Sequence, residues 1–574
     1  MNLIKKIGFC LLLVSCSSQQ FRFRAVPLAP GEKVEDHYAK GKKYMVASQG
    51  RYASQAGVKM MEMGGNAMDA AAAISFVISV ERPQSTGLGG GGFLLHWKPG
   101  LEKPESYDFR EKAPLLANEK MFLDKKGNVI PRKSLDGIFA GGVPGLVAGV
   151  IKAHAEHGKL PLSAVIAPAI ELAEKGFNIY PGLAKAMKYR AKVLASFPAT
   201  KKIFFDKEKM LEEGDLLVQA DLAKTLKHIQ KKGRAGFYKG WVAKAIVDEE
   251  RRRGGLIRMN DLRRYNVIKR EPMKGTYKGH DVYSMGPPSS GGIHVIQILN
   301  ILEPLNIGHY GIQDPRSIHL TASAMQQAFA DRARYLGDSD FVKVPIKELI
   351  SKEYASQTRA RIPRDKSLKK EEVAPGNFDG YESPETTHFS VMDSEGNVVS
   401  STQTINGYFG SGLVIPGTGI ILNNEMDDFA TKVGASNLFG AVGGKNNLVE
   451  SEKRPLSSMS PTIVMKNGFP LLAIGTPSGT RILTCVAQTI LNYIEHGESL
   501  GHSVAAVRYH QQWSPDELRV GEMGLNKGAE DKLRRMGHKI NHQNLGCRIQ
   551  AIANEKGTLR GVSDPRGQGL AVGR

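Results

Sequence analysis

The most constraining feature of this sequence is a sharp change of character at residue 386. Upstream of it, residues 142–350 place apolar side chains at helical spacing, interrupted by turns. Residues 361–385 are charged, contain proline and glycine and lack periodicity, which is typical of a mobile linker. Apolar and polar residues then alternate, and residues 387–404 predict a β-hairpin around a turn at 393–397. We therefore expect a helix-rich half, a linker and a strand-rich half, without an internal repeat.

Further elements are expected on both sides of this boundary. Two helices, 54–63 and 66–80, are predicted to be separated by Gly64-Gly65, with Asn66 as the N-cap of the second. Short runs of apolar and β-branched residues predict strands at 93–97, 419–422, 462–465 and 471–474.

Composition places the chain among ordinary globular proteins. Its 574 residues suffice for roughly two to four domains or one large fold, and 41% of them are hydrophobic. The net charge of +21 lies almost entirely in residues 1–385. No aromatic interleaving, zinc-ligand spacing or recognition-helix pattern accompanies the basic runs, so nucleic-acid binding is not indicated. The charge predicts a solvated basic face, which also suits anionic lipid headgroups or small acidic substrates.

The N-terminus is typical of an export signal and contains the only long apolar run of the sequence. Lys5 and Lys6 precede the apolar stretch 7–14, and Leu13-Val14-Ser15-Cys16 resembles the bacterial lipobox. The alternative interpretation is a plain signal peptide with an incidental cysteine. Because the rest of the chain has no comparable run, no spanning helix is expected in the body of the protein.

The lipobox resemblance implies a specific processing event. Residues 1–15 would be removed, Cys16 would carry a diacylglycerol, and residues 16–44 would form a tether to the globular body. Ser17 stands where some lipoproteins have an acidic residue, which favours the outer membrane. We therefore expect an exported protein, anchored by lipid on the periplasmic side.

Three further patterns do not identify a functional site by themselves. Residues 87–92 satisfy G-x-G-x-x-G, but a helix is predicted before them and a strand after them, which is the reverse of a dinucleotide site. His154 and His157 share a helix face without an evident third metal ligand. Cys485 and Cys547, the two cysteines of the globular body, either form one disulfide or remain buried thiols.

Thr386-Thr387 at a strand start would by itself indicate only β-propensity. The surrounding motifs change that interpretation. From about Val46 to the C-terminus, the chain resembles the γ-glutamyltransferases (γ-glutamyltranspeptidases), which are N-terminal-nucleophile hydrolases. The motifs that carry the resemblance, in order along the chain, are residues 89–93, 108–111, 287–292, 386–391, 422–429, 454–462 and 563–566.

The resemblance implies a four-layer αββα fold assembled from two chains after self-cleavage. The cleaved bond would be Glu385–Thr386, giving a large subunit, 45–385, and a small subunit, 386–574. Thr386 would be the nucleophile, and cleavage would give it an α-amine that can act as its own base. Thr404 matches a second threonine that hydrogen-bonds the nucleophile, although it could simply be a strand residue of the same hairpin.

The resemblance also implies how a γ-glutamyl group is recognised. Arg110 matches the arginine that binds the α-carboxylate, a role that suits its two-pronged guanidinium. Ser457 and Ser458 match donors to the same carboxylate. The residues that match those around the α-ammonium are Asn406, Glu425 and Asp428. Without this context, Asp427-Asp428 would be interpreted as a helix cap or a surface pair.

Two segments depart from the family pattern. The backbone of Ser478 and Gly479 matches the oxyanion hole, but Ser478 replaces a usual glycine, so donation requires that its φ remains accessible. Residues 430–449 resemble a lid over the pocket, with Phe439 where an aromatic hydroxyl is common.

The implied activity is cleavage of γ-glutamyl amides through a γ-glutamyl-threonine ester. The implied partners are glutathione and other γ-glutamyl donors, with water, amino acids or dipeptides as acceptors, and the two subunits are expected to associate as a heterodimer. No metal or organic cofactor is implied. A cephalosporin acylase or a poly-γ-glutamate depolymerase is the alternative within the superfamily. An inactive surface lipoprotein that binds ligands through its basic face is the alternative from another class.

Overall fold

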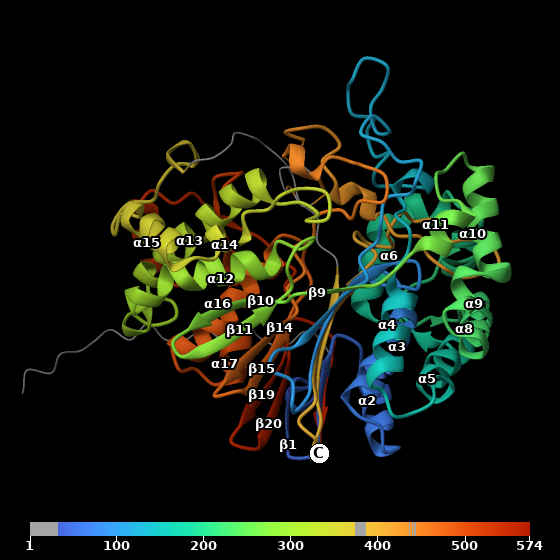
Figure 1. The fold of residues 1–574 in the computed structure, drawn as a ribbon, viewed down its shortest axis with the longest axis horizontal. Helices are drawn as coiled ribbons and strands as arrows, with labels where there is room; N and C mark the ends of the chain where they lie inside the picture. The colour runs from blue at the N-terminus through green and yellow to red at the C-terminus, as the bar shows by residue number, and fades with distance from the viewer. Residues whose placement is uncertain (1–32, 374–385, 436, 439, 441–443) are drawn as a thin grey trace, which may run out of the picture.

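The computed structural model describes residues 33–373, 386–435, 437, 438, 440 and 444–574, and these residues form four layers. Two seven-stranded antiparallel sheets pack face to face, and helices cover the outer face of each sheet (Figure 1). The predicted αββα architecture is therefore confirmed. The whole N-terminal signal and lipobox region, Cys16 included, lies outside the described part of the chain, as do Glu385 and Phe439.

The first sheet places strands from distant parts of the sequence side by side. Its order is β21, β2, β12, β13, β3, β4, β9. The bounds are β2 Met45–Ser48, β3 Gly91–Trp97, β4 Glu105–Asp108, β9 Ile268–Arg270, β12 Thr387–Met392, β13 Val398–Thr404 and β21 Leu570–Gly573. The predicted hairpin, β12–β13, thus lies at the centre of a sheet whose other strands come mostly from the N-terminal half.

The second sheet also draws on both halves of the chain. Its order is β1, β20, β19, β15, β14, β11, β10. The bounds are β1 Tyr38–Gly41, β10 Met273–Tyr277, β11 His280–Ser284, β14 Thr462–Lys466, β15 Phe469–Gly475, β19 Gln550–Glu555 and β20 Thr558–Ser563. Neither half of the sequence can therefore form this fold alone.

Apolar side chains fill the space between the two sheets and also the space between each sheet and the helices that cover it. Between the sheets, Leu95 and Trp97 of β3 pack in one cluster with Ile463 of β14 and Ile552 of β19. The helices on the outer face of the first sheet are α2 Arg51–Glu62, α3 Ala67–Glu81, α4 Leu146–His157, α5 Leu162–Lys175, α6 Pro181–Ala195, α7 Pro198–Phe204, α8 Ala220–Lys232, α9 Ala235–Tyr238, α10 Gly240–Arg252 and α11 Met259–Arg264.

A second helical layer covers the other sheet. It contains α12 Gly291–Leu302, α13 Pro315–Tyr335, α14 Ile346–Leu349, α15 Lys352–Arg361, α16 Arg481–Ile490, α17 Leu500–Ala505 and α18 Lys527–Arg535. Shorter elements decorate the layers: α1 Val34–His37, β5 Phe177–Asn178 paired with β8 Leu216–Leu217, β6 Phe205–Asp206 paired with β7 Lys209–Met210, and a small sheet of β16 Tyr509–His510, β17 Leu518–Val520 and β18 Ile540–His542.

Predictions of helices and strands that rested on a clear local sequence pattern are confirmed. α3 begins with the predicted cap, because the Asn66 side chain accepts from the backbone of Met68 and Asp69. The prediction of a strand at 419–422 is wrong. Ile421 and Leu422 form only isolated bridges, because the backbone turns at Gly417 and Gly419, where φ is +73° and +68°.

The first part of the predicted linker is docked on the protein. Ile362 and Val373 are buried in the apolar cluster of the second helical layer. Trp513 Nε1 donates to the carbonyl oxygens of Lys370 and Val373, both at 3.1 Å. The prediction of a linker from residue 361 is therefore wrong for residues 362–373, because Trp513, Asp516 and Met536, all far downstream, hydrogen-bond to this segment. Residues 374–385 lie outside the described part.

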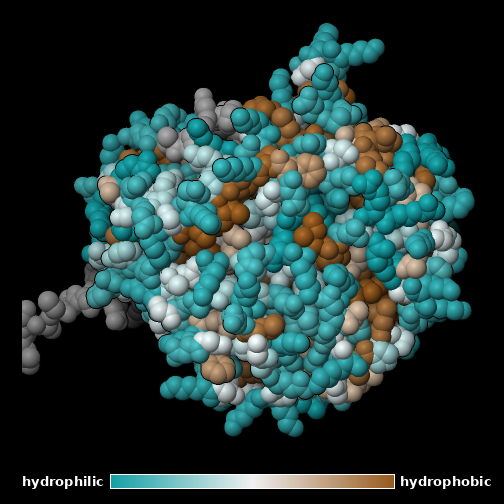
Figure 2. Space-filling view, viewed as in Figure 1, coloured by the Kyte–Doolittle hydropathy of each residue, from teal (hydrophilic) through white to brown (hydrophobic). Residues whose placement is uncertain are grey.

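Two features bear on the environment of the protein. Cys485 and Cys547 form a disulfide with an S–S distance of 2.10 Å, which decides between the two alternatives left open by the sequence. Among the described residues, no helix is long and apolar enough to span a membrane. Figure 2 shows a face that is mostly hydrophilic and is broken by separate apolar patches.

Candidate active site

Two threonine hydroxyls meet where the central hairpin opens. Thr386 directly precedes β12, and Thr404 is the last residue of β13. Their Oγ1 atoms are 3.5 Å apart, and Thr404 Oγ1 also accepts from the backbone N–H of Asn406 at 2.8 Å. Both threonines are buried. The hairpin register therefore brings a nucleophile candidate and a hydrogen-bonding hydroxyl together at one end of the sheet.

The glycine run before β3 makes this approach possible. An added Cβ at Gly90 would lie 2.0 Å from the carbonyl oxygen of Thr404, and one at Gly89 would lie 2.1 Å from that of Ile421. Gly91 pairs with Thr404 in the sheet. The run thus allows close passage of backbone past backbone, and β3 continues it as a strand rather than a helix, as the rejection of a dinucleotide site required.

Arg110 lies beyond the end of β4 and faces two acidic residues of the segment Glu425–Asp428. Its guanidinium donates to Glu425 Oε1 and to Asp428 Oδ2, and its Nε donates to the carbonyl of Pro455 at 3.2 Å. The Asp108 side chain accepts from the Arg110 backbone N–H at 2.9 Å. The arginine is 1% exposed, so these contacts form away from bulk water.

The charges around Arg110 do not balance. Glu111, Glu425 and Asp428 are all buried beside this one guanidinium. Burial raises the pKa of Glu111 to about 8 and also raises the pKa values of Glu425 and Asp428, against the opposing effect of Arg110. These same carboxylates, acting against burial, raise the pKa of Arg110, which stays charged. Arg332 is a second buried cation close to Asp428, so three carboxyl groups face two arginines and the site still contains more buried acid than base.

Two residues of this site were not predicted from the sequence. Glu111 belongs to the family motif at residues 108–111, but the motif does not indicate that the Glu111 carboxyl is buried beside Arg110. Arg332 comes from α13, and its Nε donates to Ser290 Oγ at 3.0 Å. Burial lowers the pKa of Arg332 to about 10. No local signal distinguishes Arg332 from the other arginines of its helix.

Ser457 and Ser458 are held at the pocket by hydrogen bonds to the 287–292 loop. Ser290 donates its backbone N–H to the carbonyl of Ser457 at 2.9 Å, and the hydroxyls of Ser290 and Ser458 are 3.4 Å apart. Ser457 Oγ accepts from the Met459 N–H at 3.1 Å. Hydrogen bonds between two segments far apart in the sequence thus fix both serines.

The candidate oxyanion loop has an unusual backbone. Ser478 and Gly479 have φ values of +114° and +52°, so the serine adopts a conformation that favours glycine. Ser478 Oγ donates to the carbonyl of Leu545 at 2.6 Å, and Thr476 Oγ1 accepts from the Arg548 N–H at 2.7 Å. The loop is therefore tied to the segment before β19 by two hydrogen bonds, close to the Cys485–Cys547 disulfide.

We expect Ser478→Ala and Ser478→Gly to differ measurably in stability. Both variants lose the hydroxyl bond to Leu545, which costs about 1 kcal/mol. Only glycine relieves the positive φ, which costs a non-glycine residue about 1–2 kcal/mol. Alanine should therefore lower the free energy of unfolding, and glycine should leave it nearly unchanged. Urea unfolding of both variants tests this, and equal losses would show that the backbone there is unstrained.

These segments enclose one small buried pocket. All of the predicted catalytic and binding residues line it except Ser478, which precedes Gly479 in the chain, and Glu385, which lies outside the described residues. Its lining also includes Arg332, Asn437, Leu456, Met459, Thr480 and Ile482. A larger surface depression near α17 and β20 contains none of the predicted site residues. The predicted site residues therefore gather around the small pocket that contains both threonines.

The described part of the 430–449 segment closes over the acidic residues. Asn437 Nδ2 donates to Asp428 Oδ1 at 2.9 Å, and the Leu438 N–H donates to Asp427 Oδ2 at 2.6 Å. Asp427 and Asp428 are 4% and 7% exposed, so the interpretation of this pair as a surface feature is excluded.

Comparisons with known proteins agree with this geometry. Residues 53–574 match the family model described as Gamma-glutamyltranspeptidase. The glutathione hydrolase proenzyme of Escherichia coli strain K12 is 44% identical over 568 residues, which cover 98% of this chain and 97% of the relative.

Solved structures show the same fold. A cephalosporin acylase from Bacillus halodurans superimposes with a TM-score of 0.85 at 26% identity, covering 96% of this chain and 99% of its own. A Helicobacter pylori gamma-glutamyltranspeptidase chain superimposes with a TM-score of 0.56 at 44% identity, covering 58% of this chain and 95% of its own.

Proposed function

The chain belongs to the gamma-glutamyltranspeptidase family, and we propose that it cleaves γ-glutamyl amides such as glutathione through a covalent ester on Thr386. The glutathione hydrolases to which it is similar are proenzymes. The enzyme is accordingly a self-processing N-terminal-nucleophile hydrolase, which becomes active when the bond before Thr386 is cut.

The observation that carries this proposal is the charge pattern of the Thr386 pocket. A γ-glutamyl group has an α-carboxylate and an α-ammonium at one end and the scissile carbonyl at the other. Arg110 offers a two-pronged donor for the carboxylate. The surplus acid of Glu425 and Asp428 offers partners for the ammonium, which would compensate carboxylates that Arg110 alone does not balance. Thr386 lines the same pocket and faces the carbonyl end.

Maturation follows from what the precursor threonine lacks. Within an intact chain, Thr386 has an amide nitrogen, which is no base. Attack of its Oγ1 on the Glu385 carbonyl forms an ester and releases the Thr386 nitrogen as an amine, and water then hydrolyses the ester. The free α-amine has a pKa near 8 in model compounds, so it can take the proton from the hydroxyl during turnover.

Turnover then proceeds in two acyl-transfer steps. Thr386 Oγ1 attacks the γ-carbonyl, its proton passes to the α-amine, and the leaving amine, cysteinylglycine from glutathione, takes up a proton. Water or the amine of an acceptor then attacks the ester and regenerates the hydroxyl. The Gly479 N–H, in a loop fixed by neighbouring hydrogen bonds, is a donor for the oxyanion of each step. These reaction steps use only groups of the protein, the substrate and water, and none of them requires a metal or an organic cofactor.

The direct test of this activity uses glutathione. Purified protein should release glutamate and cysteinylglycine in equal amounts, and addition of a dipeptide acceptor should yield a γ-glutamyl tripeptide. The similarity to a cephalosporin acylase makes acylase activity the second candidate. Hydrolysis of a cephalosporin amide without hydrolysis of glutathione would replace the proposal with that activity.

We also propose that the protein is exported and anchored by lipid at Cys16 to the outer membrane. The lipobox-like sequence at residues 13–16 supports this location. The Cys485–Cys547 disulfide supports it independently, because disulfides are stable mainly in oxidising compartments such as the periplasm.

Cys16→Ala should release the protein from membranes. Each buried CH₂ of an acyl chain contributes about 0.8 kcal/mol to membrane binding, so loss of the chains should move the protein from the sedimenting to the soluble fraction. Fractionation and mass spectrometry of the N-terminal peptide provide the measurement. An unmodified Cys16 in wild-type protein would contradict the anchor.

A further inference from the structure

A compact group of two histidines and a glutamate lies outside the active-site pocket. His96 is on β3, Glu105 begins β4, and His157 is the last residue of α4. His96 and Glu105 are directly opposite in the antiparallel register, so their side chains emerge on the same face of the sheet. Their ligand atoms and that of His157 all lie within 4.8 Å of one another.

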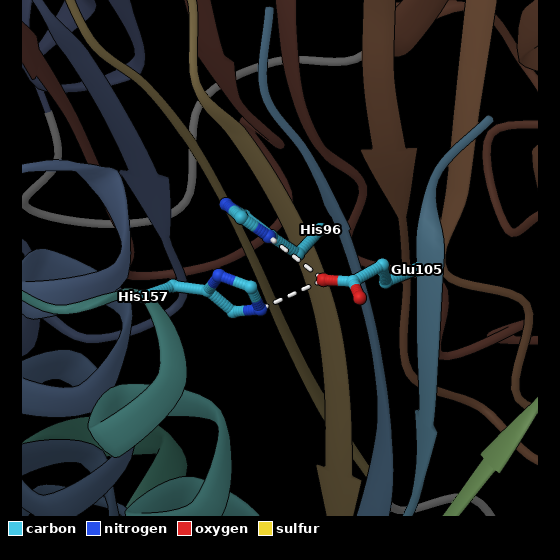
Figure 3. A group of neighbouring side chains, drawn as sticks. All are labelled: His96, Glu105 and His157. Carbon is cyan, nitrogen blue, oxygen red and sulfur yellow. Dashed lines mark ion pairs between the residues drawn. The ribbon is translucent and has the colours of Figure 1, made fainter. Parts of the chain in front are cut away.

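The three side chains converge on a single atom. His157 Nε2 is 2.7 Å and His96 Nδ1 is 3.8 Å from the same carboxylate oxygen, Glu105 Oε2 (Figure 3). The two imidazole rings lie 4.2 Å apart. Around a tetrahedral metal with bonds of about 2.0–2.1 Å, ligand atoms are about 3.3 Å apart, which lies between the two observed distances.

The hydrogen bonds of the group are incomplete. His96 is 2% exposed, and its Nδ1, which points at Glu105, has no hydrogen-bond partner within the described part of the chain. Glu105 Oε2 lacks an aligned hydrogen bond there as well. A buried nitrogen that points at a carboxylate without bonding to it is costly unless another group completes the site.

We propose that His96, Glu105 and His157 bind a divalent transition metal ion of the Zn²⁺ type. Two imidazoles and one carboxylate are a known ligand set for zinc, and water can occupy the fourth position. The ion would join the β3–β4 pair to the C-terminus of α4. Because β4 leads directly to Arg110, the site would brace the strand from which that arginine extends.

The carboxylate of Glu105 is held in an orientation that suits a cation. Lys269 Nζ lies 2.9 Å from Glu105 Oε1, which leaves Oε2 turned toward the histidines. The negative end of the α4 dipole adds a favourable field.

His154, which shares a helix face with His157, is not part of this group. His154 Nε2 lies 2.9 Å from Asp69 Oδ1, and Asp69 in turn caps α3, so His154 belongs to a structural contact. Metal binding requires the imidazole proton of His157 to reside on Nδ1. That atom has no hydrogen-bond partner in the described residues. His157 Nε2 lies 2.7 Å from the Tyr107 hydroxyl, so a metal ion would replace this contact, while Tyr107 keeps its hydrogen bond to Glu156 Oε2 at 2.6 Å.

The test measures Zn²⁺ binding to chelator-treated, purified full-length protein by competition with a chromogenic chelator. We expect one equivalent bound at micromolar free Zn²⁺, and a loss of affinity of more than about 100-fold in both Glu105→Gln and His157→Gln. His502→Gln is the matched control, because His502 also pairs with a glutamate, Glu498, at 3.3 Å, but on an exposed helix turn. This control should bind as wild type does.

Thermal unfolding provides a second readout that does not depend on activity. Zn²⁺ should raise the melting temperature of wild type and of His502→Gln, but of neither ligand variant, because an ion that binds only the folded state stabilises it. Near-UV circular dichroism establishes that the variants are folded. Binding of no Zn²⁺ by wild type, or equal affinity in wild type and both ligand variants, would overturn the proposal.

Discussion

Replacing Thr386 with alanine should leave the chain uncut and abolish turnover of γ-glutamyl substrates. Wild-type protein should yield two associated chains, ending at Glu385 and beginning at Thr386, whereas Thr386→Ala should migrate as one. The expected loss in kcat is at least about 1,000-fold, because the variant lacks both the nucleophile and the α-amine released by cleavage. Intact-mass analysis and glutathione turnover provide the two measurements.

The neighbouring threonine offers a matched control. Thr387 is also buried, and its Oγ1 has no hydrogen-bond partner among the residues the structure describes. Thr387→Ala should therefore be cut and remain active. Thr404→Ala should lie between the two, because it keeps the nucleophile but loses the 3.5 Å hydroxyl contact and the 2.8 Å hydrogen bond from the Asn406 N–H. A wild-type chain that stays whole yet hydrolyses glutathione would refute the proposed mechanism.

The parts of this fold that the sequence predicts correctly are those set by local patterns. Alternation of apolar and polar residues after Thr386 predicted β12 and β13, and the Asn66 cap predicted the start of α3. The pairing of these strands into two stacked sheets followed instead from the family resemblance. No local pattern indicates that β12 lies beside β2, more than 300 residues earlier.

The errors and omissions have a common physical cause. Whether residues 362–373 dock depends on Trp513, and whether a carboxyl such as Glu111 is buried depends on what packs over it. Arg332 reaches the pocket from a helix that is regular throughout its length. His157 finds its partners on a strand pair rather than on its own helix. Tertiary contacts of this kind leave no periodic trace in the sequence.

Arg110→Lys should separate recognition of the donor from formation of the nucleophile. In the structure, Arg110 bonds to Glu425 and Asp428 with two different nitrogens, a geometry that a single ammonium cannot reproduce. Lysine preserves the positive charge, so the buried carboxylates keep a cation and the fold should survive. Self-cleavage should also survive, because the peptide carbonyl of Glu385 has no free α-carboxylate at the corresponding position.

The expected cost falls on turnover of substrates with a free α-carboxylate. Loss of the two-pronged contact should lower kcat/KM for glutathione by about 1.5–3 kcal/mol, or about 10- to 150-fold. Arg190→Lys is the matched control: Arg190 is a buried arginine that pairs with Asp136 at 2.8 Å, and it does not line the pocket. Its kcat/KM should stay near that of wild type.

An analogue whose glutamyl α-carboxylate is amidated completes the experiment. Wild type should hydrolyse it poorly, because Arg110 then faces a neutral amide instead of a carboxylate. The contacts of Glu425 and Asp428 with the α-ammonium of the analogue should be unchanged. Arg110→Lys should therefore lose little further rate on this analogue while losing most of its rate on glutathione. Equal losses on both substrates would show that Arg110 only supports the fold of the pocket. Robust wild-type hydrolysis of the amidated analogue would show that the α-carboxylate is not recognised, and would favour the acylase activity.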